Sequence, residues 1–90
     1  MKSSNQKNVV VGLGEIGMPI CKVLSKNAIT VGYDLDKKLM NLKKIKKYEN
    51  YDTLILHICI PFTKRFVTEV KKLTKQFNPK ILAIHSTISP

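Results

Sequence analysis

Short apolar runs alternate with amphipathic segments along the chain. Four runs, at 9–11, 29–33, 53–60 and 81–84, are rich in β-branched and aliphatic residues, which is typical of strands covered on both faces. Between the runs, apolar residues recur three or four positions apart, and this spacing predicts helices. Strands joined by helical crossovers form parallel sheets, so the pattern predicts an α/β fold.

Three helices are expected between these strands. The first covers 16–24, with Val23 on its apolar face. The second, over 35–45, is short, with leucines spaced along one side and lysines along the other. The third covers 66–77, with Val67 among its apolar residues and lysines on its solvent side.

The expected architecture is a Rossmann-like three-layer α/β/α domain with a parallel sheet of about four strands. Crossover handedness leaves few arrangements, and the order 2-1-3-4, with strands numbered along the chain, fits best. The switch point then lies between the first and third strands, and a ligand crevice is expected there, at the carboxyl ends. We expect a single domain over 8–90, preceded by a flexible polar tail at 1–7.

The first strand runs directly into a G-x-G-x-x-G turn that opens a helix. In such a turn Gly12 permits the tight exit from the strand, Gly14 admits a pyrophosphate to the backbone, and Gly17 lets the helix pack closely on the sheet. Free amides at the helix start then bind the phosphate. The alternative is a glycine-rich turn that serves packing alone.

Asp34 closes the second apolar run, twenty residues after Gly14. A carboxylate at this place accepts the hydroxyls of the adenosine ribose, and its charge repels a 2′-phosphate, which favours NAD over NADP. Alternatively, Asp34 or Asp36 caps the basic helix that follows. Glu15 is expected near the phosphates, with its carboxylate turned to solvent.

The chain of 90 residues has a formal net charge of +10, from 16 Lys and Arg against 6 Asp and Glu. Such a field attracts phosphate-bearing ligands, acidic proteins or nucleic acid, and it also keeps a small domain soluble. Nucleic acid is the less favoured partner, because the lysines spread over two helices and Arg65 is the single arginine. No apolar run is long enough for a membrane span and no secretory signal is visible, so the cytoplasm is the expected location.

Cys21 and Cys59 fall inside expected elements, and we expect both to be reduced and mostly buried. His57 is expected to be a buried, hydrogen-bonded imidazole, whereas His85 lies at the crevice end of the fourth strand. No acid that would orient a base stands near either histidine, so neither is assigned a proton-transfer role. The spacing of the four residues gives no zinc pattern.

Four segments of the chain, in order, resemble the amino-terminal part of the UDP-glucose/GDP-mannose dehydrogenase family: Gly12–Pro19, Val31–Asp34, Ile58–Pro61 and His85–Pro90. The likeness spans roughly 8–90, and its Ser-Thr-x-x-Pro ending is its most specific part. Related β-hydroxyacid dehydrogenases share the first two segments. The resemblance implies the NAD-binding domain of enzymes that oxidise a nucleotide sugar twice, from alcohol to acid.

The resemblance also implies which residues contact NAD. The turn and the end of the second strand would hold the pyrophosphate and the ribose. The residues after the third strand would line the middle of the cofactor, and those after the fourth would lie near its nicotinamide end. These are Gly12, Leu13, Gly14, Glu15, Ile16, Gly17, Asp34 and Leu35; Cys59, Ile60 and Pro61; and Ser86 and Thr87.

The chain departs from the family in several places. Phe62 stands where the family usually has a threonine, and the stretch between Asp36 and Asp52 is too short for a strand that the family has. The second strand is therefore expected to be a sheet edge, open to pairing in a homodimer. The family's catalytic cysteine, lysine and sugar-binding residues belong to segments beyond Pro90, and Cys59 cannot replace that nucleophile because it belongs to the cofactor motif.

We therefore expect this chain to bind NAD(H) without catalytic residues of its own, a dehydrogenation requiring a further catalytic domain or partner chain. The alternative is a non-enzymatic module on a reduced Rossmann scaffold. Such a module would sense a nucleotide or assemble through its open sheet edge.

Overall fold

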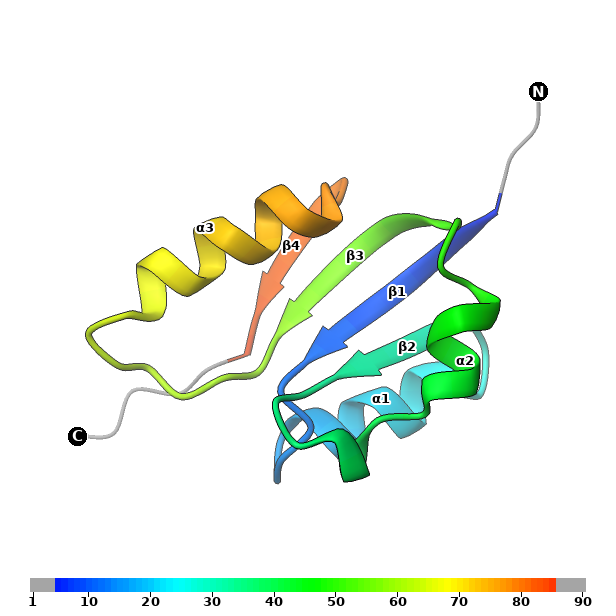
Figure 1. The fold of residues 1–90 in the computed structure, drawn as a ribbon, viewed down its shortest axis with the longest axis horizontal. Helices are drawn as coiled ribbons and strands as arrows, with labels where there is room; N and C mark the ends of the chain where they lie inside the picture. Colours follow the sequence, from blue (N-terminus) through cyan, green and yellow to red (C-terminus); the bar gives the residue numbers. More distant parts are fainter. Residues whose placement is uncertain (1–4, 86–90) are drawn as a thin grey trace.

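A computed structural model describes residues 5–85. Its four strands, β1 (Gln6–Val11), β2 (Thr30–Tyr33), β3 (Asp52–Ile58) and β4 (Ile81–Ile84), form one parallel sheet in the order β2-β1-β3-β4 (Figure 1). The predicted α/β fold, the parallel sheet and the strand order 2-1-3-4 are confirmed. Parallel pairing places all four carboxyl ends at the same edge of the sheet.

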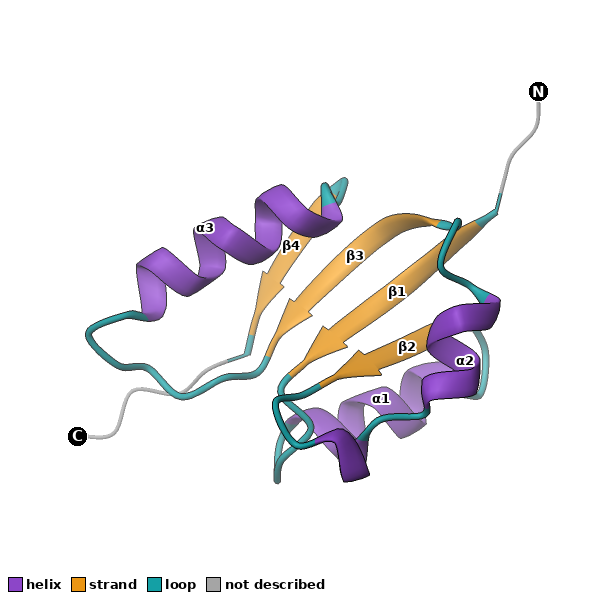
Figure 2. Ribbon diagram, in the orientation of Figure 1, coloured by secondary structure: helices purple, strands orange, loops and turns teal. Residues whose placement is uncertain are grey.

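Helices connect the strands on both faces of the sheet (Figure 2). These are α1 (Gly17–Ser25), α2 (Leu42–Lys47) and α3 (Phe66–Phe77), with a short 3-10 helix, η1 (Lys37–Leu39), before α2. In the view of Figure 1, α1 lies behind the sheet, and α2 and α3 lie in front of it. Within the described part of the chain, no helix has the length and apolar character that a membrane span requires.

The hydrophobic core lies on the face of the sheet that α3 covers. Val9, Val11, Leu56 and Ile58, from the two central strands, are at most 9% exposed and pack with Phe66 of α3. Central strands are covered on both sides, which is why their sequences are almost continuously apolar.

The apolar faces of the helices are narrower than the sequence predicted. Val23 of α1 is 61% exposed and Val67 of α3 is 59% exposed, although both were expected on buried faces. Val67 follows Phe66 directly and so lies about 100° around the helix from it. Phe66, not Val67, is the side chain that reaches the core.

The first strand begins earlier than expected. Gln6 and Lys7, predicted to belong to a flexible tail, lie in β1 and pair with Asp52 and Thr53 of β3. Lys7 is 5% exposed, and its Nζ donates to the Tyr48 carbonyl oxygen at 2.9 Å. Backbone pairing with β3 and the hydrogen bond of the Lys7 ammonium group together extend β1 to residues before its apolar run.

The lysine-rich segment forms two short helices where one was predicted. Asp36 caps η1 by accepting from the Lys38 amide at 3.0 Å, and Asn41 caps α2 by accepting from the Lys44 amide at 3.1 Å. Two helix starts so close together divide the segment. Leu35, expected on a shared apolar face, lies before the first of these helices and is fully exposed.

Candidate functional site at the carboxyl ends of the strands

A cleft of about 880 Å³ opens at the carboxyl ends of β1, β2 and β3. Its size falls within the range of roughly 300–1,000 Å³ that is usual for small-molecule sites. Nine of the residues predicted to bind cofactor line it: Gly12, Gly14, Glu15, Ile16, Asp34, Leu35, Cys59, Ile60 and Pro61. Three separate segments of the sequence thus meet around one cavity.

Gly12 and Gly17 shape the turn through close backbone contacts. Gly12 has a φ of +96°, and a Cβ on it would lie 2.7 Å from the Cys59 carbonyl oxygen. A Cβ on Gly17 would overlap the Gly12 carbonyl oxygen. A larger residue at Gly12 would press on the backbone that follows β3, and a larger residue at Gly17 would press on the turn itself.

Gly14 differs from both of its neighbours in the motif. A Cβ built on it would meet no atom within 4 Å, and the residue is exposed at the wall of the cleft. Packing therefore does not explain a glycine here. The open space beside its backbone is where a ligand could approach the main chain closely.

The residues that lead into α1 line the same cavity. Ile16 is the N-cap residue, and no side chain makes a capping hydrogen bond there. Glu15 and Ile16 are exposed and line the cleft. The first amides of a helix have no intrahelical acceptor, and together with the helix dipole they favour an anion.

Asp34 lies against this turn, at the end of β2, and is held by backbone donors. Its Oδ2 accepts from the Leu13 amide at 2.7 Å, and its Oδ1 accepts from the Asp36 amide at 2.8 Å. The Asp36 amide first, and the Leu13 amide second, lower the pKa of Asp34 below its usual value. The carboxylate is therefore charged at neutral pH and fixed in orientation, with further lone pairs free for a ligand.

Two of the predicted residues act on the site indirectly. Leu13 is 4% exposed, and its side chain packs where a Cβ of Gly32 would be, so only its amide serves the site. Gly17 is buried behind the turn. Ser86 and Thr87 lie outside the described residues.

The third wall of the cleft comes from α3 and the loop before it, which the sequence did not assign to the site. Its members are Thr63, Arg65, Glu69, Leu73, Gln76 and Phe77, joined by Val11 and Tyr33 of the sheet. The position of α3 directly after a strand could have indicated these residues. A helix that follows a strand starts at the carboxyl edge of the sheet, so its first turns and the polar residues flanking its apolar stripe border the crevice.

Cys59 lines the cleft, but its surroundings do not favour a reactive thiolate. Burial, and secondly the nearby Cys21, raise the pKa of the Cys59 thiol, which disfavours the nucleophilic thiolate. Cys21 and Cys59 are free thiols, half-buried rather than mostly buried as predicted. Between residues 5 and 85, no group of three or more His, Cys, Asp or Glu is arranged to hold a metal ion.

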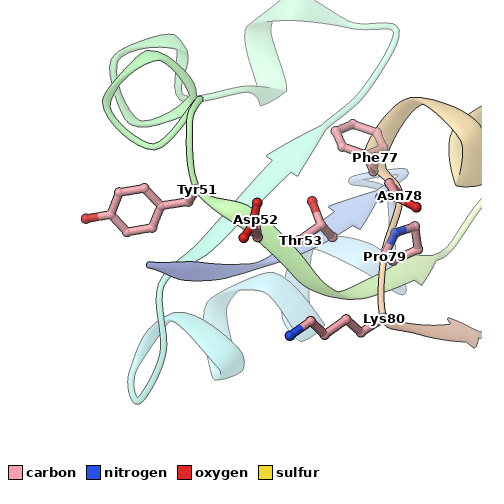
Figure 3. A pocket seen from close by; sticks show the side chains of 7 residues that line it. All are labelled: Tyr51, Asp52, Thr53, Phe77, Asn78, Pro79 and Lys80. Atoms are coloured by element: carbon pink, nitrogen blue, oxygen red, sulfur yellow. The ribbon is translucent and has the colours of Figure 1, made fainter. Parts of the chain in front are cut away.

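A second, smaller hollow of about 360 Å³ lies at the opposite edge of the sheet, near the start of β3 (Figure 3). It is lined by the connections that enter β3 and β4, from Tyr51 to Thr53 and from Phe77 to Lys80. In Figure 3 the Tyr51 ring points away from the side where Phe77 lies. Ligands of open α/β sheets bind at the other edge, so this hollow is not the candidate site.

The fold and the cleft define a small Rossmann-like α/β domain with a crevice at its topological switch point. No family model, curated protein or solved structure matches the chain.

Proposed function

We propose that this chain is an NAD-binding domain, similar to that of the nucleotide-sugar 6-dehydrogenases. The observation that carries the proposal is the contrast within the glycine motif. Gly12 and Gly17 are required by contacts inside the protein, whereas Gly14 borders open space in a cleft that also contains a fixed carboxylate. A turn kept for packing alone would not need a glycine at its middle position.

The residues present fit a dinucleotide. The turn around Gly14 and the start of α1 would hold the pyrophosphate by backbone amides. Asp34 would accept from the hydroxyls of the adenosine ribose, and its charge would disfavour the 2′-phosphate of NADP. Ile60 and Leu73 contribute apolar surface to the same cleft. Bound NAD supplies hydride transfer, and the chain's contribution is to bind and orient it.

A binding titration of the full chain tests this proposal. NAD⁺ is expected to bind saturably, at micromolar to millimolar concentration, and more tightly than NADP⁺. Gly14→Val should abolish binding because its side chain occupies the ligand's place, while Lys71→Ala, on the exposed side of α3, should bind as the wild type does. Absence of saturable binding at millimolar NAD⁺ would overturn the proposal.

A second candidate function is assembly, which the exposure of β4 favours. β4 is an edge strand of the described sheet, and Ile81, Leu82 and Ile84 are 51%, 40% and 51% exposed. Exposed apolar edge strands tend to pair with other chains. In this version the chain is a nucleotide-sensing module, and gel filtration should show a dimer whose population responds to NAD⁺. A strictly monomeric chain at all concentrations would exclude it.

A further inference from the structure

The two histidines of the chain meet at the carboxyl end of the β3–β4 pair, apart from the cleft. His57 Nδ1 lies 2.8 Å from His85 Nε2, and the two rings stack with centroids 5.1 Å apart. His57 is 8% exposed, whereas His85 is half-buried. The backbone amide of His85 donates to the Ile58 carbonyl oxygen at 2.8 Å, so the pair sits beside a backbone hydrogen bond that joins the chain after β4 to the end of β3.

The other ring nitrogen of His57 identifies its tautomer. His57 Nε2 is buried and has no hydrogen-bond partner. Burying an N–H group that has no acceptor costs more free energy than burying a ring nitrogen whose lone pair has no donor. The second arrangement is possible when the other nitrogen of the ring carries the proton and donates it. The neutral pair is therefore arranged with the proton of His57 on Nδ1, donating to His85 Nε2.

In this arrangement, adding a proton to either ring leaves an N–H group without an acceptor or sets two donors against each other. Protonating His57 puts a charged N–H on the buried Nε2, where nothing accepts it. Protonating His85 at Nε2 sets two donors against each other, unless the bond reverses, and reversal again leaves an N–H on His57 Nε2. Protonation can be accommodated only if the bond breaks and the half-buried His85 turns to water.

Among residues 5–85, no charged group stands where it would compensate a proton on His57. Val10 and Ala83 flank His57 in the neighbouring strands, and Lys7 and Asp52 stand at the opposite end of the sheet. The ionisable residues of α1 are Cys21 and Lys22. Burial, and then the charge of His85, lower the pKa of His57, with no other group contributing.

We propose that the His57–His85 pair is a pH-sensitive latch, which fastens the carboxyl end of β4 to β3 when neutral and releases it when the pair takes up a proton. The latch stands apart from the cofactor cleft, so it does not depend on the proposed NAD binding. The attachment of the edge strand β4 to β3 therefore depends on pH. β1 and β2 contain no part of the latch.

Nuclear magnetic resonance of the full chain tests the latch in two stages. At pH 7.5, ring ¹⁵N shifts should show His57 as the Nδ1–H tautomer. Between pH 7.5 and pH 5.5, the hydrogen-exchange protection of the β4 amides should fall by about tenfold or more, while that of the β1 amides stays constant. In His85→Asn, whose amide oxygen still accepts from His57 but takes up no proton, β4 protection should not change with pH.

Three outcomes would overturn the latch. The first is an Nε2–H tautomer of His57 at pH 7.5, and the second is β4 protection in the wild type that does not respond to pH. The third is a His85→Asn variant with the same loss of protection at the same pH. The first two need only the wild-type chain, so the test stands even if the variant fails to fold.

Discussion

For Gly14 and Gly17, two glycines of the first turn, we expect opposite effects of the same substitution. Gly14→Ala should leave the free energy of unfolding within about 0.5 kcal/mol of wild type, since nothing lies near the new methyl group, but it should weaken NAD⁺ binding. Gly17→Ala should lower the free energy of unfolding by on the order of 3 kcal/mol, because its Cβ overlaps the Gly12 carbonyl. Urea unfolding of both variants, beside a binding titration, checks the pair. Equal losses of stability would contradict the distinction.

Asp34 links the turn to pH through its hydrogen bonds. Its pKa is lower in the folded chain than in the unfolded chain, so its ionised form contributes stability above the unfolded pKa, and this is lost as the pH falls through the folded pKa. Wild type should therefore exceed Asp34→Asn in free energy of unfolding near pH 7, and the difference should shrink below about pH 4. Chemical denaturation at several pH values measures it. A difference that is constant with pH would show that the charge of Asp34 plays no part.

Single residues of the site were partly readable from the sequence. Gly12, Gly14 and Asp34 were predictable because the backbone geometry of a tight turn and the end of a strand restrict the residue types found there. The separation of roles was not readable: Leu13 serves through its amide alone, and Arg65 borders the cleft from a loop whose path depends on tertiary packing. Neither fact affects the spacing of apolar residues along the sequence, so that spacing cannot predict it.

At the scale of elements, the end of α3 depends on one residue in the left-handed conformation. Asn78 has a φ of +46°, and its amide donates to the Thr74 carbonyl oxygen at 2.8 Å. Asn78→Gly should raise the free energy of unfolding by up to about 1 kcal/mol, and Asn78→Ala should lower it by a similar amount, because only glycine adopts this conformation without a Cβ penalty. Urea denaturation gives both values. A stabilising Asn78→Ala would contradict the assignment.

The existence of most elements followed from apolar spacing, but the division of the lysine-rich segment did not. β1, β3 and α3 were predictable because most of the apolar side chains that define them also form or border the hydrophobic core. In the segment before β3, by contrast, the capping side chains of Asp36 and Asn41 outweigh the leucine spacing. Local hydrogen bonds of this kind compete with helix continuation and are hard to weigh against periodicity.

At the scale of the whole molecule, the net charge of +10 should make stability depend on salt. Like charges on a small domain repel one another in the compact state, and about 0.1 M salt screens them beyond roughly 10 Å. The thermal midpoint should therefore rise by a few degrees between about 10 mM and 200 mM NaCl. Scanning calorimetry at both salt concentrations checks this. A midpoint that falls with added salt would mean that attractive charge pairs dominate.

We propose that the turn at Gly12–Gly17 and the carboxylate of Asp34 together bind an adenine dinucleotide. Mapping of amide shifts in the ¹⁵N-labelled chain during an NAD⁺ titration tests it most directly. Saturable shifts are expected to concentrate at Gly14, Ile16, Asp34 and Ile60, whereas Tyr51, Asp52 and Thr53, at the opposite edge of the sheet, should not shift. Shifts that do not saturate at millimolar NAD⁺, or that gather away from the turn, would contradict it.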